Sequence, residues 1–87
     1  MNMTAFRERL LSLPEGACDV TFRSRRYLLS IERVAGDRIT KLYARELGGR
    51  DIVSGNYFTT VRNGLLKPCE MSPKKVVDFI LGMEPCS

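Results

Sequence analysis

Alternation of apolar and polar residues between Tyr27 and Val61 constrains this chain more than any other feature of its sequence. A period of two is typical of β-strands that bury one face and leave the other open. Turn residues interrupt the alternation at Gly36-Asp37 and at Gly48-Gly49-Arg50-Asp51. The pattern therefore predicts three consecutive antiparallel strands.

The Gly36-Asp37 loop also predicts a pairing register, because Gly and Asp tolerate the positive φ of two-residue hairpin loops. That register joins one oppositely charged pair and two apolar pairs, as cross-strand neighbours prefer. These pairs are Glu32 with Lys41, Ile31 with Leu42, and Leu29 with Ala44. Across the second turn, the expected pairs are Leu47 with Ile52, Ala44 with Gly55, and Leu42 with Tyr57.

A fourth strand is expected before these three, from Ala17 to Arg23. A tight turn at Ser24-Arg25 would pair it with the next strand, Phe22 with Tyr27 and Val20 with Leu29. The four strands then share one apolar face, made of Cys18, Val20, Phe22, Tyr27, Leu29, Ile31, Leu42, Ala44, Val53, Tyr57 and Val61. Arg33 is in phase with this set, and we expect it at the rim of the sheet with its head hydrated.

Two amphipathic helices flank the strands. Residues 4 to 13 carry apolar side chains at helical spacing, and Thr4 or Asn2 is the expected N-cap. A second helix starts at Ser72-Pro73, a favoured pair of N-cap and first helical residue, and closes at Gly82. Because each helix has one apolar stripe, both should cover the apolar sheet face. The sequence predicts an α+β fold: a single two-layer α-β-β-β-β-α domain over residues 1–87, with a four-stranded antiparallel meander and both helices on one face.

Composition limits the classes of function. The chain has 87 residues and a net charge of +4, which permits but does not require nucleic acid or an acidic partner. No apolar run approaches the roughly 20 residues of a membrane helix, and the N-terminus lacks the apolar run of a signal peptide. We expect a cytoplasmic protein that does not enter the membrane.

The reactive residues are few. The three cysteines, Cys18, Cys69 and Cys86, lack CxxC spacing, which argues against a disulfide framework or a zinc site. The chain has no histidine, which excludes Ser-His-Asp and Cys-His catalysis. We expect no metal and no cofactor, and these absences favour a non-catalytic protein over an enzyme.

The polar face of the sheet is the first candidate site. It interleaves aromatic and cationic side chains, the combination that stacks on bases and binds phosphates. The residues concerned are Arg23, Arg26, Lys41, Tyr43, Arg45, Asn56 and Phe58. The glycine and aromatic signature of RNA-recognition motifs is missing, so three interpretations stay open: a hydrated face without a partner, a protein partner or homodimer, and single-stranded nucleic acid.

Cys69 is the second candidate, as the centre of a thiol enzyme or redox sensor. A helix N-terminus and neighbouring lysines favour the thiolate, although a structural cysteine is the alternative. Cys18 is expected in the core and Cys86 free at the tail. Lys74 and Lys75, in the first turn of the second helix, form a possible anion site, with ordinary surface charge as the alternative.

Two segments, Lys41-Leu42-Tyr43-Ala44-Arg45-Glu46-Leu47-Gly48-Gly49 and Leu66-Lys67-Pro68-Cys69-Glu70-Met71, resemble a group of short uncharacterised bacterial proteins. Some members of that group carry the label peptide methionine sulfoxide reductase. The A-type reductases have their nucleophile in Gly-Cys-Phe-Trp, a motif that this sequence lacks. The resemblance therefore implies no established activity, and Cys69 is the one residue to which it would assign a thiol role.

Overall fold

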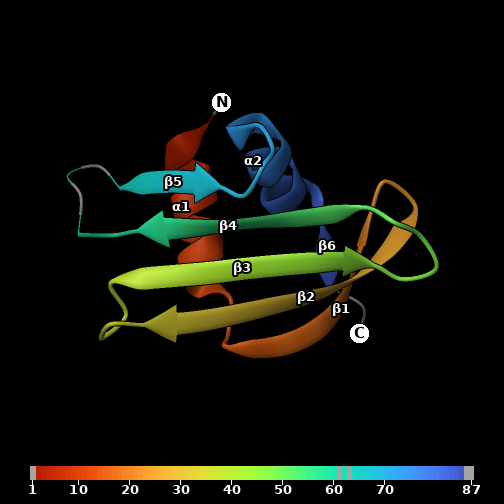
Figure 1. Cartoon of the computed structure of the whole chain (residues 1–87), viewed down its shortest axis with the longest axis horizontal. Coiled ribbons are helices and arrows are strands. Elements are labelled where there is room, and N and C mark those ends of the chain that lie inside the picture. The colour runs from red at the N-terminus through yellow and green to blue at the C-terminus, as the bar shows by residue number, and fades with distance from the viewer. Residues whose placement is uncertain (1, 61, 63, 86–87) are drawn as a thin grey trace.

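The computed structural model describes residues 2–60, 62 and 64–85. Along the chain its elements are α1 (Met3–Ser12), β1 (Gly16–Phe22), β2 (Arg25–Val34), β3 (Ile39–Glu46), β4 (Ile52–Phe58), β5 (Leu65–Pro68), α2 (Pro73–Gly82) and β6 (Glu84–Pro85). The strands form one antiparallel sheet in the order β5-β4-β3-β2-β1-β6 (Figure 1). The predicted α+β class is confirmed, but the sheet has six strands where four were expected.

The two unexpected strands are short and lie at the edges of the sheet. β5 pairs with β4 and ends at Pro68, while β6 pairs with Val20 and Thr21 of β1 and ends at Pro85. Proline lacks an N–H group, so it is tolerated in an edge strand. In the sequence alone, however, a proline argues against assigning a strand to its segment. Segments this short also carry too few residues to show a period of two.

The β2–β3 register is the predicted one, with Glu32 opposite Lys41 and Leu29 opposite Ala44. The β1–β2 register differs by two residues, because the turn lies at Arg23 and Ser24 and not at Ser24-Arg25. Both turn residues have positive φ, 51° and 66°, as a hairpin turn that follows the twist of its strands requires. Val20 consequently faces Tyr27.

The β3–β4 register was also predicted two residues away from its true position. Ala44 faces Val53, and the ladder continues to the Glu46 N–H, which donates to the Asp51 carbonyl at 2.9 Å. A shift by an even number of residues leaves every side chain on its own face of the sheet. The expected division into two faces therefore survives both errors of register, except for Arg23, which the shifted turn takes out of the strand.

Both helices pack against the face that carries Tyr27 and Tyr57. The Phe6 ring of α1 meets the Tyr57 ring edge-on at 5.7 Å, and the Phe79 ring of α2 meets the Tyr27 ring at 5.0 Å. The buried core consists of Phe6, Leu10, Val20, Tyr27, Leu29, Ile31, Leu42, Ala44, Val53, Tyr57, Val76, Val77, Phe79, Ile80 and Met83. Figure 1 shows α1 crossing behind the strands and α2 beside it.

One expected core residue, Cys18, is exposed. It lies in β1 before the two residues that β6 covers, so this part of β1 is the open edge of the sheet. Val61, also expected in the core, and Cys86 lie outside the described residues.

The helix ends are held by side chains. Asn2 caps α1 by accepting the Ala5 N–H at 3.0 Å, and Ser72 caps α2 by accepting the Lys75 N–H at 3.2 Å. Arg33 lies near the end of β2 and is half-buried, but its guanidinium contacts α1, where a hydrated head was expected. Its Nη2 donates to three carbonyls at the C-terminal end of α1, those of Leu10 (3.2 Å), Leu11 (3.2 Å) and Leu13 (2.7 Å).

Candidate functional site

The face of the sheet opposite the helices carries six of the seven predicted binding residues. Cross-strand partners share a face, and the pairs on this side include Thr21–Arg26, Leu28–Arg45, Ser30–Tyr43, Lys41–Asn56 and Ile39–Phe58. We call this side the outer face. It is assembled from every strand between β1 and β5, so the binding residues depend on the whole meander for their arrangement.

Tyr43 lies near the middle of the outer face, between Ser30 of β2 and Ser54 of β4. Its side chain is 46% exposed, the largest value among the exposed large hydrophobic residues of the described chain. Lys41 and Arg45 flank it along β3, each two residues away and therefore about 7 Å along the strand. An aromatic ring is thus open to solvent between two exposed cations.

A hollow of about 400 Å³ opens beside Tyr43. It is lined by Ser30, Glu32, Lys41, Leu42, Tyr43, Ser54, Gly55, Asn56 and Cys69. Cys69 reaches this position because the β4–β5 ladder continues one step beyond β5: the Cys69 N–H donates to the Ser54 carbonyl at 3.1 Å. The two candidate sites of the sequence, the outer face and Cys69, therefore meet at one hollow.

Lys67 belongs to the same surface but was missing from the predicted set. It lies in β5 opposite Asn56, which places it on the outer face in the same cross-strand row as Lys41, two strands away with β4 between them. Sequence reasoning overlooked it because Pro68 obscured the strand. The alternation of apolar Leu66 with charged Lys67 was the signal in the sequence that could have indicated this strand. In the structure Leu66 is half-buried and Lys67 is exposed.

The cations around Tyr43 are not neutralised by close carboxylates. Within residues 2–60, 62 and 64–85, no carboxylate oxygen lies within 4.0 Å of the charged nitrogens of Lys41, Arg45 or Lys67. Glu32 shares the face opposite Lys41 in the register. The neighbourhood of Tyr43 thus combines three cations with one carboxylate.

The other predicted arginines lie away from Tyr43. Arg26 is on the outer face but near its far end, where its Nη2 is 2.9 Å from Asp19 Oδ2. Arg23 lies on the helix side: its guanidinium covers the Phe22 ring at 4.8 Å from the ring centre and is 4.0 Å from Asp78 of α2. Its place in the turn, with positive φ, removes it from the alternation of the strands.

Phe58 is on the outer face but half-buried, at the end of the sheet away from Arg26. It forms an apolar cross-strand row with Val34, Ile39 and Leu65. Phe58 therefore closes one end of the outer face and packs there, whereas Tyr43 presents its ring to solvent.

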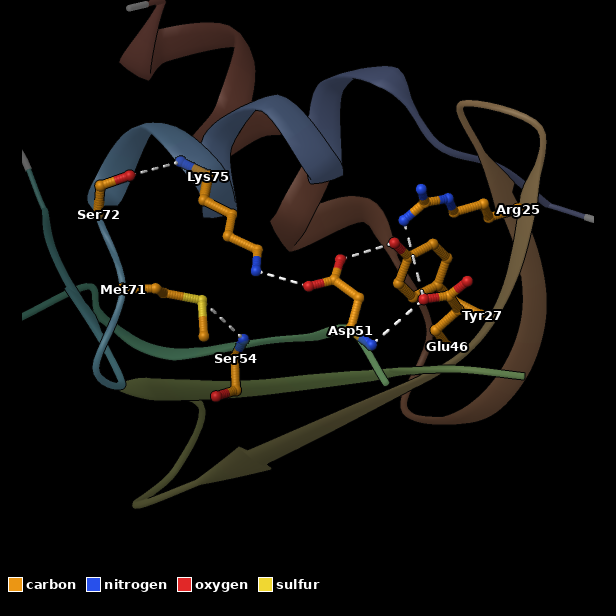
Figure 2. A network of polar contacts seen from close by, with 8 residues as sticks. All are labelled: Arg25, Tyr27, Glu46, Asp51, Ser54, Met71, Ser72 and Lys75. Atoms are coloured by element: carbon orange, nitrogen blue, oxygen red, sulfur yellow. Dashed lines mark hydrogen bonds and ion pairs between the residues drawn. The ribbon is translucent and has the colours of Figure 1, made fainter. Parts of the chain in front are cut away.

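Lys74 and Lys75, predicted as an anion site, both contact carboxylates. Lys75 Nζ is 2.6 Å from Asp51 Oδ1, and Lys74 forms an ion pair with Asp78 one turn along α2. Figure 2 shows Lys75 reaching from the first turn of α2 to Asp51, which directly precedes β4. Lys75 thus ties α2 to the end of the sheet, whereas the Lys74 ion pair lies within α2.

A polar network surrounds this tie. The Tyr27 hydroxyl donates to Asp51 Oδ2 at 2.7 Å, and Glu46 accepts the Asp51 N–H at 3.2 Å (Figure 2). Burial and the Asp51 carboxylate raise the pKa of Tyr27 to about 12. Burial alone would raise the pKa of Asp51, but the hydrogen bonds from Lys75 and Tyr27 and the Lys75 charge outweigh it and lower that pKa. The network therefore stays as neutral tyrosine and ionised carboxylate at neutral pH.

Two further classes of site have no counterpart in the described part of the chain. No group of three or more His, Cys, Asp or Glu side chains is arranged to hold a metal ion among these residues. Over the same residues, neither helix has the length and apolar character needed to cross a bilayer.

In comparisons with known proteins, the chain matches no family model, no curated protein and no solved structure.

Proposed function

We propose that the chain is a small non-catalytic binding or assembly module and that the outer face around Tyr43 is its binding surface. The observation that carries this proposal is the exposed Tyr43 ring between Lys41 and Arg45, at the margin of a hollow of about 400 Å³. An open aromatic ring, nearby cations and a concave surface with a few polar groups are properties of ligand sites.

The helix side supports binding over acid–base chemistry. A general base works best with a pKa near the working pH, whereas the pKa of Tyr27 is about 12 and that of Asp51 is lowered. Both Asp51 carboxylate oxygens are already engaged, one by Lys75 and the other by Tyr27. The chain also contains no histidine.

The alternative function is a thiol enzyme or redox sensor centred on Cys69. It is favoured by one observation, that Cys69 is exposed and lines the hollow beside Tyr43. The rate of alkylation as a function of pH tests it, with Cys18, which is also exposed, as the internal reference. A Cys69 that reacts no faster than Cys18 at neutral pH would exclude this function.

The binding surface can be located before its natural ligand is known. We expect small aromatic and heterocyclic compounds, screened by NMR, to shift the signals of Tyr43, Asn56 and Cys69, because concave sites with an open aromatic ring concentrate binding energy. Tyr43→Ser should weaken these compounds at least about fivefold, since stacking on an aromatic ring is lost.

Leu11→Ser is the matched control. Leu11 is also a large exposed apolar residue, 37% exposed, and it lines a separate hollow on α1 with Met3. The proposal requires that Leu11→Ser leave binding unchanged. Compounds that bind the α1 hollow and leave the Tyr43 signals in place would contradict it.

A further inference from the structure

The ligand class of the outer face follows from the order of its side chains along β3. Resting on the function proposed above, we propose that the Tyr43 surface binds single-stranded nucleic acid. Lys41, Tyr43 and Arg45 alternate along one side of β3, so a ring that can stack on a base has a cation about 7 Å away in each direction along the strand. Stacking on aromatics within a basic groove is how proteins hold single strands.

Lys67 extends the positive charge of the outer face to β5. It is separated from Lys41 by Asn56 in the cross-strand row, so it lies two strands from β3 at the level of Lys41, whereas Lys41 and Arg45 flank Tyr43 within β3 itself. In the described part of the chain none of the three has a carboxylate within 4.0 Å. They are therefore available to neutralise phosphates, and the backbone of a strand whose base stacks on Tyr43 would lie among them.

The hollow beside Tyr43 suits the edge of a base. Its rim carries the Asn56 amide, which has both donors and acceptors, and the hydroxyl-bearing residues Ser30 and Ser54. Stacking on Tyr43 requires an unpaired base, because the bases of a duplex already stack on one another. The geometry therefore favours single strands over duplex.

A second copy of the chain fits this surface less well. In a two-fold dimer the same patch faces itself, which would bring Lys41, Arg45 and Lys67 against a surface of the same sign. The cores of protein interfaces are also depleted in lysine and serine, the residues that surround Tyr43.

Fluorescence polarisation with a labelled oligouridine or oligothymidine of about eight nucleotides tests the inference. With three phosphate contacts on a single strand, the logarithm of the binding constant should fall with the logarithm of salt concentration with a slope of about −2, which is a loss of about twentyfold between about 50 and 200 mM salt. Replacing Lys41 or Lys67 by glutamine should each reduce the magnitude of this slope by about 0.7.

Tyrosine variants separate stacking from charge. Tyr43→Ser should weaken binding at least about fivefold without changing the salt slope, and Tyr43→Phe should retain wild-type affinity. Lys74→Gln is the matched charge control, because Lys74 lies on α2, on the other side of the sheet, and its removal should leave the affinity unchanged.

Three results would overturn the inference: no binding at about 50 mM salt, equal affinity for duplex with no effect of Tyr43→Ser, or a concentration-dependent dimer in sedimentation that Tyr43→Ser abolishes. The proposed function is judged separately. If the small compounds bind at Tyr43 and the oligonucleotides do not, the surface stands and its ligand class is wrong; if neither binds there, both proposals fall.

Discussion

Arg33 shows at the scale of one residue why a charged side chain can occupy an apolar position. Its place in β2 is in phase with the core residues Ile31 and Leu29, which directs its side chain toward the helices. The last carbonyls of a helix have no partners within the helix, and the Arg33 guanidinium donates to three of those at the end of α1. The charged residue at an apolar position of the sequence pattern is explained by this contact between β2 and α1, two segments distant in sequence.

Tyr27 and Asp51 form a second residue-scale contact, and it should make stability depend on pH. The pKa of Tyr27 is about 12 in the folded chain and about 10 when unfolded. A pKa raised by folding means that the stabilisation is complete below pH about 10 and is lost as pH rises toward about 12, because only the unfolded chain ionises in this window.

Tyr27→Phe tests this effect. We expect the free energy of unfolding, measured in urea, to fall between pH about 9 and about 11. The fall should be about 1 kcal/mol larger for the wild-type chain than for Tyr27→Phe. Tyr43→Phe, which removes a hydroxyl from the outer face, should keep the wild-type loss. Equal pH dependence in the wild type and Tyr27→Phe would show that the Tyr27 hydroxyl does not carry the effect.

At the scale of elements, strands with a long alternating pattern were predictable and short edge strands were not. β2 and β3 span 10 and 8 residues, enough for alternation and turn chemistry to agree on a register. β5 has 4 residues and β6 has 2, and each contains a proline. These strands form because the adjacent strand, once in the sheet, has unpaired backbone N–H and C=O groups with which they can hydrogen-bond. That partner is present only in the assembled sheet.

The connection into β5 depends on a close contact at Gly64. Gly64 has φ of +76°, and a Cβ at this position would overlap the hydroxyl of Tyr57, which is buried in the core. Gly64→Ala should therefore combine the strain of a left-handed backbone with overpacking, and we expect a loss of about 2–4 kcal/mol in chemical denaturation.

Gly36→Ala is the control for that experiment. Gly36 has a similar φ of +67°, but nothing lies within 4 Å of the added Cβ. Gly36→Ala should therefore lower the free energy of unfolding by the backbone strain alone, about 1–2 kcal/mol. Similar losses for both variants would mean that Tyr57 moves aside without cost.

For the whole molecule, the two helices cover one sheet face and leave the other open, as the alternation predicted. The central strands β2 and β3 are paired on both sides, whereas β5 and β6 are edges. Backbone hydrogen bonds near the edge of a sheet break by local opening more readily than those in its centre. Stability should therefore decrease from the centre of the sheet toward both edges.

Native-state hydrogen exchange measures this gradient. Amides in β2 and β3 should exchange only through global unfolding, with the free energy that denaturation gives, while amides in β5 should exchange through a smaller local opening. Equal protection of β5 and β3 would show that the edge strand opens only when the whole sheet does.

The sequence by itself determined the face of the sheet on which most strand residues lie, where α2 begins, and that Tyr43 lies with Lys41 and Arg45 on the open side. These features follow from local periodicity and capping, and an error of two residues in register does not alter them. Only the tertiary structure decided that Cys69 and Lys67 join Tyr43, that Arg33 caps α1, and that Lys75 reaches Asp51. Each of these contacts joins segments distant in sequence, and its geometry depends on turns and short edge strands whose conformation is set when the sheet and helices pack together.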